Sequence, residues 1–496
     1  MEAASPRHAD YWKQQFENAL LAPVRAMRLE YLPLLMVYFA YGAMGLTAVA
    51  ESFWIKKDLT WTPAELSALA VWFSLPWTMK MVFGELVDTV PLLGSQRRAY
   101  VFVGASLIAV SFVLLAGAAG GWITAMAPDR LYVAASIMSV TGLVIQDVVA
   151  DAMSTEVVAR TNADGSPRTK ADIDHDLGMV QVLGRLALAF GVFSVAGISG
   201  WLAAWVSYST VFLCGLIVPV VSISGALLVH LETSERRKTD WRILGGGLVF
   251  GAFVVAMALS SIDYSQEIIF VVSMAVVIWM LDRVTHEVDH ATRMRVVYAA
   301  IIIFAFRATP SAGEGYRWFA IDVLGFDEGF YGTLAQIGAG LSLAGAWLFS
   351  DVITRQPIAK VLLWLTIVGT VLSLPTIALA LRWDEWTMAT FGFGARTIAL
   401  VDTTVTSPFA ELSMIPALTL VAVNAPSGRR ATWFALMASL MNVALVAGQL
   451  QTKYLNLLFA VDRGSYADLA ALTVAAVTIG FIVPVAGILA FGKRAT

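Results

Sequence analysis

Two carboxylates lie four residues apart inside an apolar run of the chain, in the stretch GLVIQDVVADAMSTEVV. Asp147 and Asp151 are about one helical turn apart, so they share a helix face. Two carboxylates this close in a poorly solvated cavity do not both ionise easily, and one of them can load and release a proton. We therefore predict a proton-coupling role for this pair, in which one acid loads and releases a proton. Asp402 is a further proton-coupling candidate. The alternative is a structural pairing of both acids with Arg185 or Lys80.

Other charged residues also stand inside apolar runs, where each costs about 2.5–3.5 kcal/mol at the centre of a membrane and therefore needs a reason. A guanidinium can bind a carboxylate through two parallel hydrogen bonds, which favours an anionic substrate. The predicted substrate-binding residues are Arg307, Arg185, Lys80, Trp77 and Glu411. For Arg307, the alternative is a local ion pair with Glu314.

Aromatic residues near these cations are candidates for stacking on a flat heterocycle. They are Trp77, Tyr316, Trp318 and Phe319. The alternative is that they anchor helices at the membrane interface, where Trp and Tyr are common.

A small residue and three charged residues occur together in LPWTMKMVFGELVDTVPLLGSQRR, where an apolar run ends. They are Gly84, Asp88, Arg97 and Arg98. Glycine allows a second helix to approach closely, and a carboxylate can accept charge-assisted hydrogen bonds from arginines. We predict a cytoplasmic gate here; the alternative is a set of ordinary interface charges that anchor a helix end. Glu156, one turn before Arg160, is expected to form a separate interfacial salt bridge.

The elements that must position these residues are membrane-spanning helices. Of the 496 residues, 58% are hydrophobic and 14% are charged, whereas soluble domains carry about 25% charged residues. A spanning helix needs about twenty apolar residues, and about fourteen runs meet that condition. The predicted spans are 30–54, 63–88, 99–119, 131–156, 177–200, 207–231, 243–261, 266–283, 294–312, 328–350, 357–381, 398–424, 430–452 and 466–491.

Lysine and arginine collect in alternate gaps between these spans, which places both termini in the cytoplasm. The first six and the last six spans predict two pseudo-symmetric halves around a central site. We expect a cytoplasmic lead-in at 1–29, an N-terminal six-helix half at 30–231, a linker with two extra membrane helices at 232–293, and a C-terminal six-helix half at 294–492. The fold class is thus an all-α polytopic membrane protein.

Several motifs, in this order, resemble one family. The second span and its loop, with Gly84, Asp88 and the Arg97-Arg98 pair, resemble the cytoplasmic loop motif of the major facilitator superfamily. The stretches LPWTMKMVFGELVDTVPL, IQDVVADAMSTE, FRATPSAGEGYRWFAIDVLGF, MIPALTLVAVNAP and ATWFALMASLMN resemble the folate–biopterin transporter family within it. The resemblance covers both halves, and it implies a major-facilitator-like fold and a folate- or pterin-like solute. The chain departs from the family pattern at the extra pair of spans, at Arg307 and at Glu411.

These observations predict a secondary transporter that works by alternating access on a small, anionic, folate- or pterin-like solute, possibly with protons, in a bacterial inner membrane. Its other partner is membrane lipid; no nucleic acid is expected at a net charge of −3, and no cofactor or metal. The alternatives are a carrier of an unrelated solute and a non-transporting assembly factor or sensor on the same fold. A membrane enzyme is disfavoured because the sequence has no P-loop, no Asp-rich metal motif and no mid-span histidine.

Overall fold

The computed structural model describes residues 27–92, 94–95, 97–162, 164–228, 241–260, 262–286, 290–354, 358–409 and 430–495. Within these ranges nearly all ordered structure is helical, as the sequence predicts for an all-α membrane protein. Ten helical segments are long and apolar enough to cross a membrane, and they correspond to the first eight predicted spans, the eleventh and the last. Helices also coincide with the predicted spans 294–312, 328–350 and 430–452. The span 398–424 begins as a helix and then leaves the described residues, so the total of fourteen stays a prediction.

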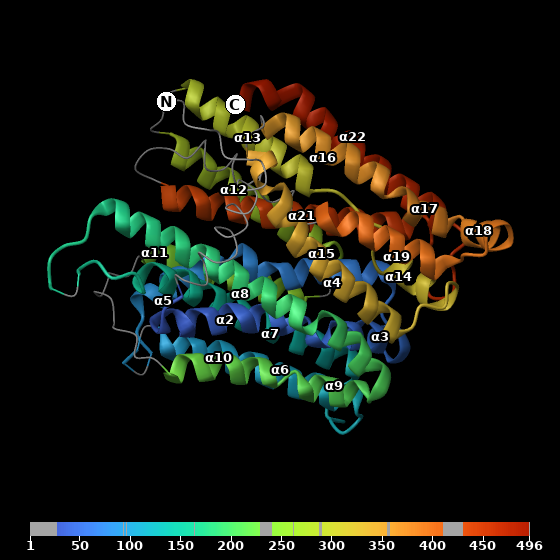
Figure 1. Cartoon of the computed structure of the whole chain (residues 1–496), viewed down its shortest axis with the longest axis horizontal. Coiled ribbons are helices and arrows are strands. Elements are labelled where there is room, and N and C mark those ends of the chain that lie inside the picture. Colours follow the sequence, from blue (N-terminus) through green and yellow to red (C-terminus); the bar gives the residue numbers. More distant parts are fainter. Residues whose placement is uncertain are drawn as a thin grey trace, which may run out of the picture.

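The first bundle comprises helices α2 to α10, which lie together in the lower part of Figure 1. Its helices are α2 Leu32–Ala43, α3 Ala48–Asp58, α4 Pro63–Thr78, α5 Lys80–Thr89, α6 Arg98–Ala119, α7 Pro128–Glu156, α8 Lys170–Trp205, α9 Tyr208–Cys214 and α10 Ile217–Leu228. The pairs α6–α7, α2–α8 and α2–α10 make its main internal contacts. Tyr31, Leu34, Tyr100, Val144 and Met153 are among the residues of its core.

The second bundle comprises helices α13 to α22, coloured yellow to red in Figure 1. Its helices are α13 His290–Arg307, α14 Gly313–Asp322, α15 Glu328–Thr354, α16 Ile358–Leu372, α17 Leu374–Ala380, α18 Trp383–Phe391, α19 Ala395–Thr406, α21 Arg430–Leu458 and α22 Leu469–Ala495. Helix α22 packs along α13 and α16. Two further helices, α11 Trp241–Leu259 and α12 Ser265–Thr285, connect the bundles in the sequence, as predicted for the extra pair.

The second predicted span is divided into two helices, α4 and α5. Helix α4 begins with a capping box, in which the Thr62 side chain accepts from Glu65 N and the Glu65 carboxylate accepts from Thr62 N. Pro76 lies inside α4 and cannot donate a backbone hydrogen bond, and the helix ends two residues later at Thr78. Met79 has φ −93° and ψ 9°, so the chain leaves helical geometry there. As a result, Lys80 is the first residue of a new helix rather than a residue in mid-helix.

The two bundles meet along two helix pairs, α8 with α15 and α4 with α21. Several polar contacts join them at the end that the arginine distribution places outside. We call this group the outer contact network; it consists of Arg463, Lys56, Asp322, Tyr208 and Glu328. Arg463 donates to the backbone carbonyls of Ile55, Lys56 and Trp61, and its guanidinium lies 4.5 Å from the centre of the Trp318 ring. Lys56 pairs with Asp322, and the Tyr208 hydroxyl donates to Glu328 at 2.7 Å.

Candidate functional site

Lys80 forms ion pairs with both of the acids that the sequence singles out. Its Nζ lies 2.5 Å from Asp147 Oδ2 and 2.7 Å from Asp151 Oδ2. The ammonium is placed by the start of α5, and the carboxylates lie one turn apart on α7. The Asp147 side chain is 11% exposed and the Asp151 side chain 50% exposed, so water reaches one acid far better than the other.

Tyr38 of α2 and Arg185 of α8 complete this group. We call it the Lys80 cluster, and its members are Lys80, Asp147, Asp151, Tyr38 and Arg185. The Tyr38 hydroxyl donates to Asp151 Oδ1 at 2.9 Å. Arg185, an exposed residue on α8, is close enough to act electrostatically on Asp147 and Tyr38, although it makes no ion pair with any described residue. The sequence argument missed Tyr38; the available signal was its phenol within the first span.

Trp77 is placed next to the Lys80 cluster and at the contact between the two bundles. Its ring stacks on Tyr41, with centroids 6.0 Å apart and an interplanar angle of 27°. Its carbonyl accepts from Asn442 of α21 at 3.2 Å, a bond between the first and the second bundle. A flat aromatic pair therefore stands within a few residues of Lys80, where the two bundles touch.

The Lys80 cluster holds two carboxylates and one paired ammonium. The two carboxylates compete for one cation, so adding a proton to either acid leaves Lys80 bound to the other alone. The second hydrogen-bonding direction of the ammonium then becomes available to an external anion. This arrangement can exchange a proton for a ligand carboxylate without leaving a charge unpaired.

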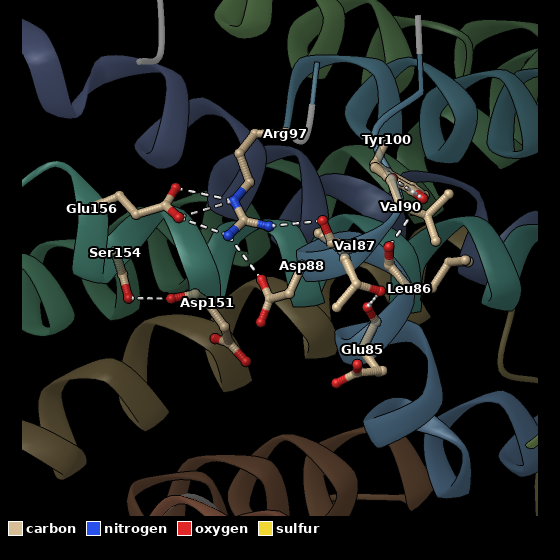
Figure 2. A network of polar contacts seen from close by, with 11 residues as sticks. Glu85, Leu86, Val87, Asp88, Val90, Arg97, Tyr100, Asp151, Ser154 and Glu156 are labelled. Carbon is tan, nitrogen blue, oxygen red and sulfur yellow. Dashed lines mark hydrogen bonds and ion pairs between the residues drawn. The ribbon is translucent and has the colours of Figure 1, made fainter. Parts of the chain in front are cut away.

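Arg97 is the centre of the predicted gate (Figure 2). Its Nη2 lies 2.8 Å from Asp88 Oδ1 and 2.6 Å from Glu156 Oε1, its Nε donates to Glu156 Oε2 at 3.0 Å, and its Nη1 donates to the Val87 carbonyl at 3.1 Å. Burial alone would lower the pKa of the Arg97 guanidinium, but the hydrogen bonds and charges of Glu156 and Asp88 outweigh that effect and raise it. The guanidinium thus joins the end of α5, the start of α6 and the end of α7.

Three expectations around this gate change. Glu156 is not a separate interfacial residue, because it pairs with Arg97, 59 residues earlier in the sequence, and so belongs to the gate. Arg98 takes no part in these ion pairs; its guanidinium lies 5.7 Å from the centre of the Phe102 ring. The physical reason is direction, since consecutive residues at the start of α6 point to different sides. Gly84 has no atom of another element within 4 Å of where a Cβ would stand, so no close helix contact depends on it.

Arg307 lies in a different place from the Lys80 cluster. It lines a cavity of about 530 Å³ inside the second bundle, between α13, α16, α17 and α22. Hydroxyl groups of Thr309, Thr366 and Thr370 line the same cavity. The Glu314 carboxylate lies 3.8 Å from the Arg317 guanidinium, with which it forms an ion pair.

The remaining candidates divide between the second bundle and the part of the chain outside the described residues. Asp402 lies part-buried on α19, and no contact among the described residues joins it to the Lys80 cluster. Glu411 lies outside the described residues. Trp318 is fully buried beneath Arg463, and Phe319 packs in the core with Tyr466, so neither offers a free face to a solute.

Comparison with known proteins identifies the family to which this chain belongs. The sequence profile described as the BT1 family matches residues 42–495. The folate-biopterin transporter of Synechocystis sp. is 26% identical over 432 residues, which cover 86% of this chain and 75% of that protein. Probable folate-biopterin transporter 4 of Arabidopsis thaliana is 21% identical over 471 residues, which cover 87% of this chain and 89% of the plant protein.

Solved structures of transporters share the fold. A POT family transporter in complex with 5-aminolevulinic acid superposes with a TM-score of 0.66 at 14% identity, covering 94% of this chain and 96% of that one. The nucleoside transporter NupG superposes with a TM-score of 0.56 at 12% identity, covering 94% of this chain and 100% of that one. The fold is therefore that of the major facilitator superfamily, and the chain is a multi-pass membrane transporter, not an enzyme, that belongs to the BT1 family.

Proposed function

We propose that this protein is a secondary transporter that moves a folate- or pterin-like organic anion by alternating access, coupled to protons. In this proposal residues 30–231 and 294–492 are the two moving halves, and residues 232–293 are a linker. Both termini lie in the cytoplasm of a bacterial cell whose inner membrane holds the protein. The names of the relatives support the solute class, and the positive-inside pattern supports the orientation.

One observation carries the proposal: the ammonium of Lys80 is shared between Asp147 and Asp151. The positive charge of Lys80 is neutralised by two carboxylates at once, so the loss of one ion pair leaves the other in place. Protonation of Asp151, the more exposed acid, frees one side of Lys80 for a carboxylate of the solute. Deprotonation on the other face of the membrane restores the second ion pair and expels the anion. Proton movement and solute movement are thereby linked through one cation.

The groups around Lys80 support a flat, anionic solute. The stacked pair Trp77 and Tyr41 lies next to the cation and offers an aromatic surface for a heterocycle. Arg185 adds a second positive charge that no described carboxylate neutralises by direct contact. We assign Arg307, in the cavity of the second bundle, to a second carboxylate of the solute or to the anion during its passage. Asp402 is the second proton-coupling candidate.

The test is uptake of labelled folate and reduced pterins into proteoliposomes, with and without an inward proton gradient. We expect the gradient to accelerate uptake by the unchanged protein. In Asp151→Asn, gradient-driven uptake should fall at least tenfold, while exchange of internal for external solute without a gradient should persist, because the amide can bond to Lys80 but carries no titrating proton. Asp164→Asn, at an exposed loop carboxylate, is the matched control and should retain gradient-driven uptake.

Gradient-driven uptake that survives in Asp151→Asn and in Asp147→Asn would remove the coupling role from both acids. A correctly folded protein that takes up none of these solutes, but takes up another anion from a panel, would identify a carrier of an unrelated solute. Absence of any uptake would favour the non-transporting assembly factor or sensor.

A further inference from the structure

The extra helices α11 and α12 enclose an apolar cavity that the transport proposal does not use. The cavity has a volume of about 430 Å³ and lies between these two helices, the junction of α4 and α5, and α21. Its walls are mainly apolar and include Met79, Val82, Phe250 and Met280. This size falls in the range of about 300–1,000 Å³ of pockets that bind small molecules.

Charged and aromatic side chains gather at one end of the cavity. Arg242 lies in the first turn of α11, and Met280 lies near the last turn of α12, so both mark the end of the helices that the arginine distribution assigns to the cytoplasm. Trp279 lines the cavity there, and the Arg283 guanidinium lies 5.4 Å from the centre of its ring. Trp and Arg side chains at this depth are typical of the level of lipid headgroups.

The outer face of α11, on the side away from the cavity walls, carries exposed apolar side chains. Leu248 and Val249 on α11 are more than two-thirds exposed, and a transporter buries such side chains only in lipid. The helix that forms one wall of the cavity therefore borders lipid tails on its outer side. Two of its wall residues are methionines of the α4–α5 region, whose unbranched side chains adapt to a flexible chain.

We propose that this cavity binds an acyl chain of a phospholipid from the cytoplasmic leaflet, with the lipid phosphate at Arg242. The walls match a hydrocarbon tail, and the guanidinium matches a phosphate at the charged end of the cavity. Pockets of basic residues between membrane helices on the cytoplasmic side bind anionic headgroups, which favours an anionic lipid over a zwitterionic one. The bound chain touches Met79, the residue between α4 and α5, so the lipid supports the break that positions Lys80.

The experiment uses the full-length protein in vesicles that contain phosphatidylglycerol with a photoactivatable diazirine on its acyl chain. After illumination, the modified residues are mapped by peptide mass spectrometry. We expect adducts on the cavity walls, at Val82, Phe250 and Met280. Adducts confined to the outer face, at Leu248 and Val249, would overturn the proposal without any variant.

Two adjacent glycines of α11 provide a matched pair of variants. Gly246 lines the cavity, Gly245 does not, and neither has an atom within 4 Å of where a Cβ would stand. Gly246→Leu should fill the cavity and reduce wall adducts at least fivefold, whereas Gly245→Leu should leave them unchanged. Equal labelling of the two variants would contradict an acyl chain in the cavity.

The headgroup is tested separately. In vesicles that contain both probes, the phosphatidylglycerol probe should label the walls at least threefold more than the same probe in phosphatidylcholine, and Arg242→Gln should abolish that preference. Inorganic phosphate should not compete, because it lacks the chain. Equal labelling by the two lipids in the unchanged protein, or competition by inorganic phosphate, would overturn the assignment of Arg242 to a lipid phosphate.

Discussion

At the scale of single residues, Arg97 shows how one side chain joins three helix ends. Its donors reach Asp88, Glu156 and the Val87 carbonyl, and the guanidinium is almost completely buried. Arginine suits this position because its planar fork offers five donors in fixed directions, whereas lysine offers one compact ammonium. Removing the guanidinium would leave two acids without their common cation.

We therefore expect Arg97→Ala to destabilise the protein by about 3 kcal/mol. This value is at the low end of the cost of breaking a buried ion pair, because both acids are partly exposed. Arg97→Lys should recover only part of that loss. The measurement is thermal unfolding in detergent micelles. Arg98→Ala is the control; it removes a cation–π contact with Phe102 worth about 0.5–1 kcal/mol. Equal stability of the two alanine variants would show that Arg97 does not hold the helix ends together.

At the scale of elements, the contact between α8 and α15 depends on glycines at the outer end. A Cβ at Gly200 would lie 2.3 Å from the Glu328 carbonyl oxygen and 2.4 Å from Gly332 Cα. Both are backbone atoms, so no side-chain rotation relieves the clash. Gly197, one turn earlier, donates its N–H to the Gln336 side chain at 2.9 Å. Helices α8 and α15 can approach each other this closely only because glycine has no side chain at these positions.

Gly200→Ala should therefore disfavour outer closure by about 1–3 kcal/mol, the usual cost of overpacking. The readout is labelling of Gln336→Cys, in a Cys214→Ser background, by a membrane-impermeant maleimide added from outside. We expect labelling about tenfold faster in Gly200→Ala than in the parent, since 1.4 kcal/mol changes an equilibrium tenfold.

Gly340→Ala is the matched control on the same helix pair. A Cβ there would meet only two Phe193 side-chain atoms, at 3.4 and 3.9 Å, which are ordinary contacts. Its labelling rate should equal that of the parent. If Gly200→Ala also labels at the parent rate, the close glycine contact does not determine outer closure.

At the scale of the whole molecule, the structure has its two bundles joined at the outer end. The contacts of the outer contact network cross from one bundle to the other, and Arg463 makes several of them at once. An alternating-access transporter must break such contacts to open outward. In the proposed mechanism, their strength therefore contributes to the balance between the two states.

Arg463→Ala should shift that balance toward the outward-open state at least tenfold, because hydrogen bonds to a charged group contribute about 1.5–3 kcal/mol. Spin labels at Met126 and Trp386, exposed outer residues of the first and second bundle, report the change as a longer distance population in pulsed electron resonance. Arg382→Ala is the control, because Arg382 pairs with Asp384 and Glu385 within its own bundle. Identical distance distributions for Arg463→Ala and the parent would contradict a closing role for Arg463.

Several properties follow from the sequence by itself. Hydropathy is a local property, so the apolar runs predict the helices, and the two helices between the bundles, with few errors. The spacing of Asp147 and Asp151 puts them on one face of α7 because a helix has about 3.6 residues per turn. Ordered motifs along the chain were enough to indicate the family. The break at Met79 was missed, although Pro76 was a signal for it.

The partners of the charged residues were decided by the tertiary structure. Lys80 meets Asp151 across 71 residues, Arg97 meets Glu156 across 59, and Arg463 reaches Trp61 across 402. The sequence offered Arg185 and Lys80 equally as partners for the acids. It predicted a local interfacial salt bridge for Glu156 near Arg160, whereas Glu156 pairs with Arg97. Arg307 shares no described contact with the Lys80 cluster and lines a cavity of its own. The physical reason is that hydropathy and helical spacing act within a segment, whereas an ion pair depends on which helices pack together and how each is rotated about its axis.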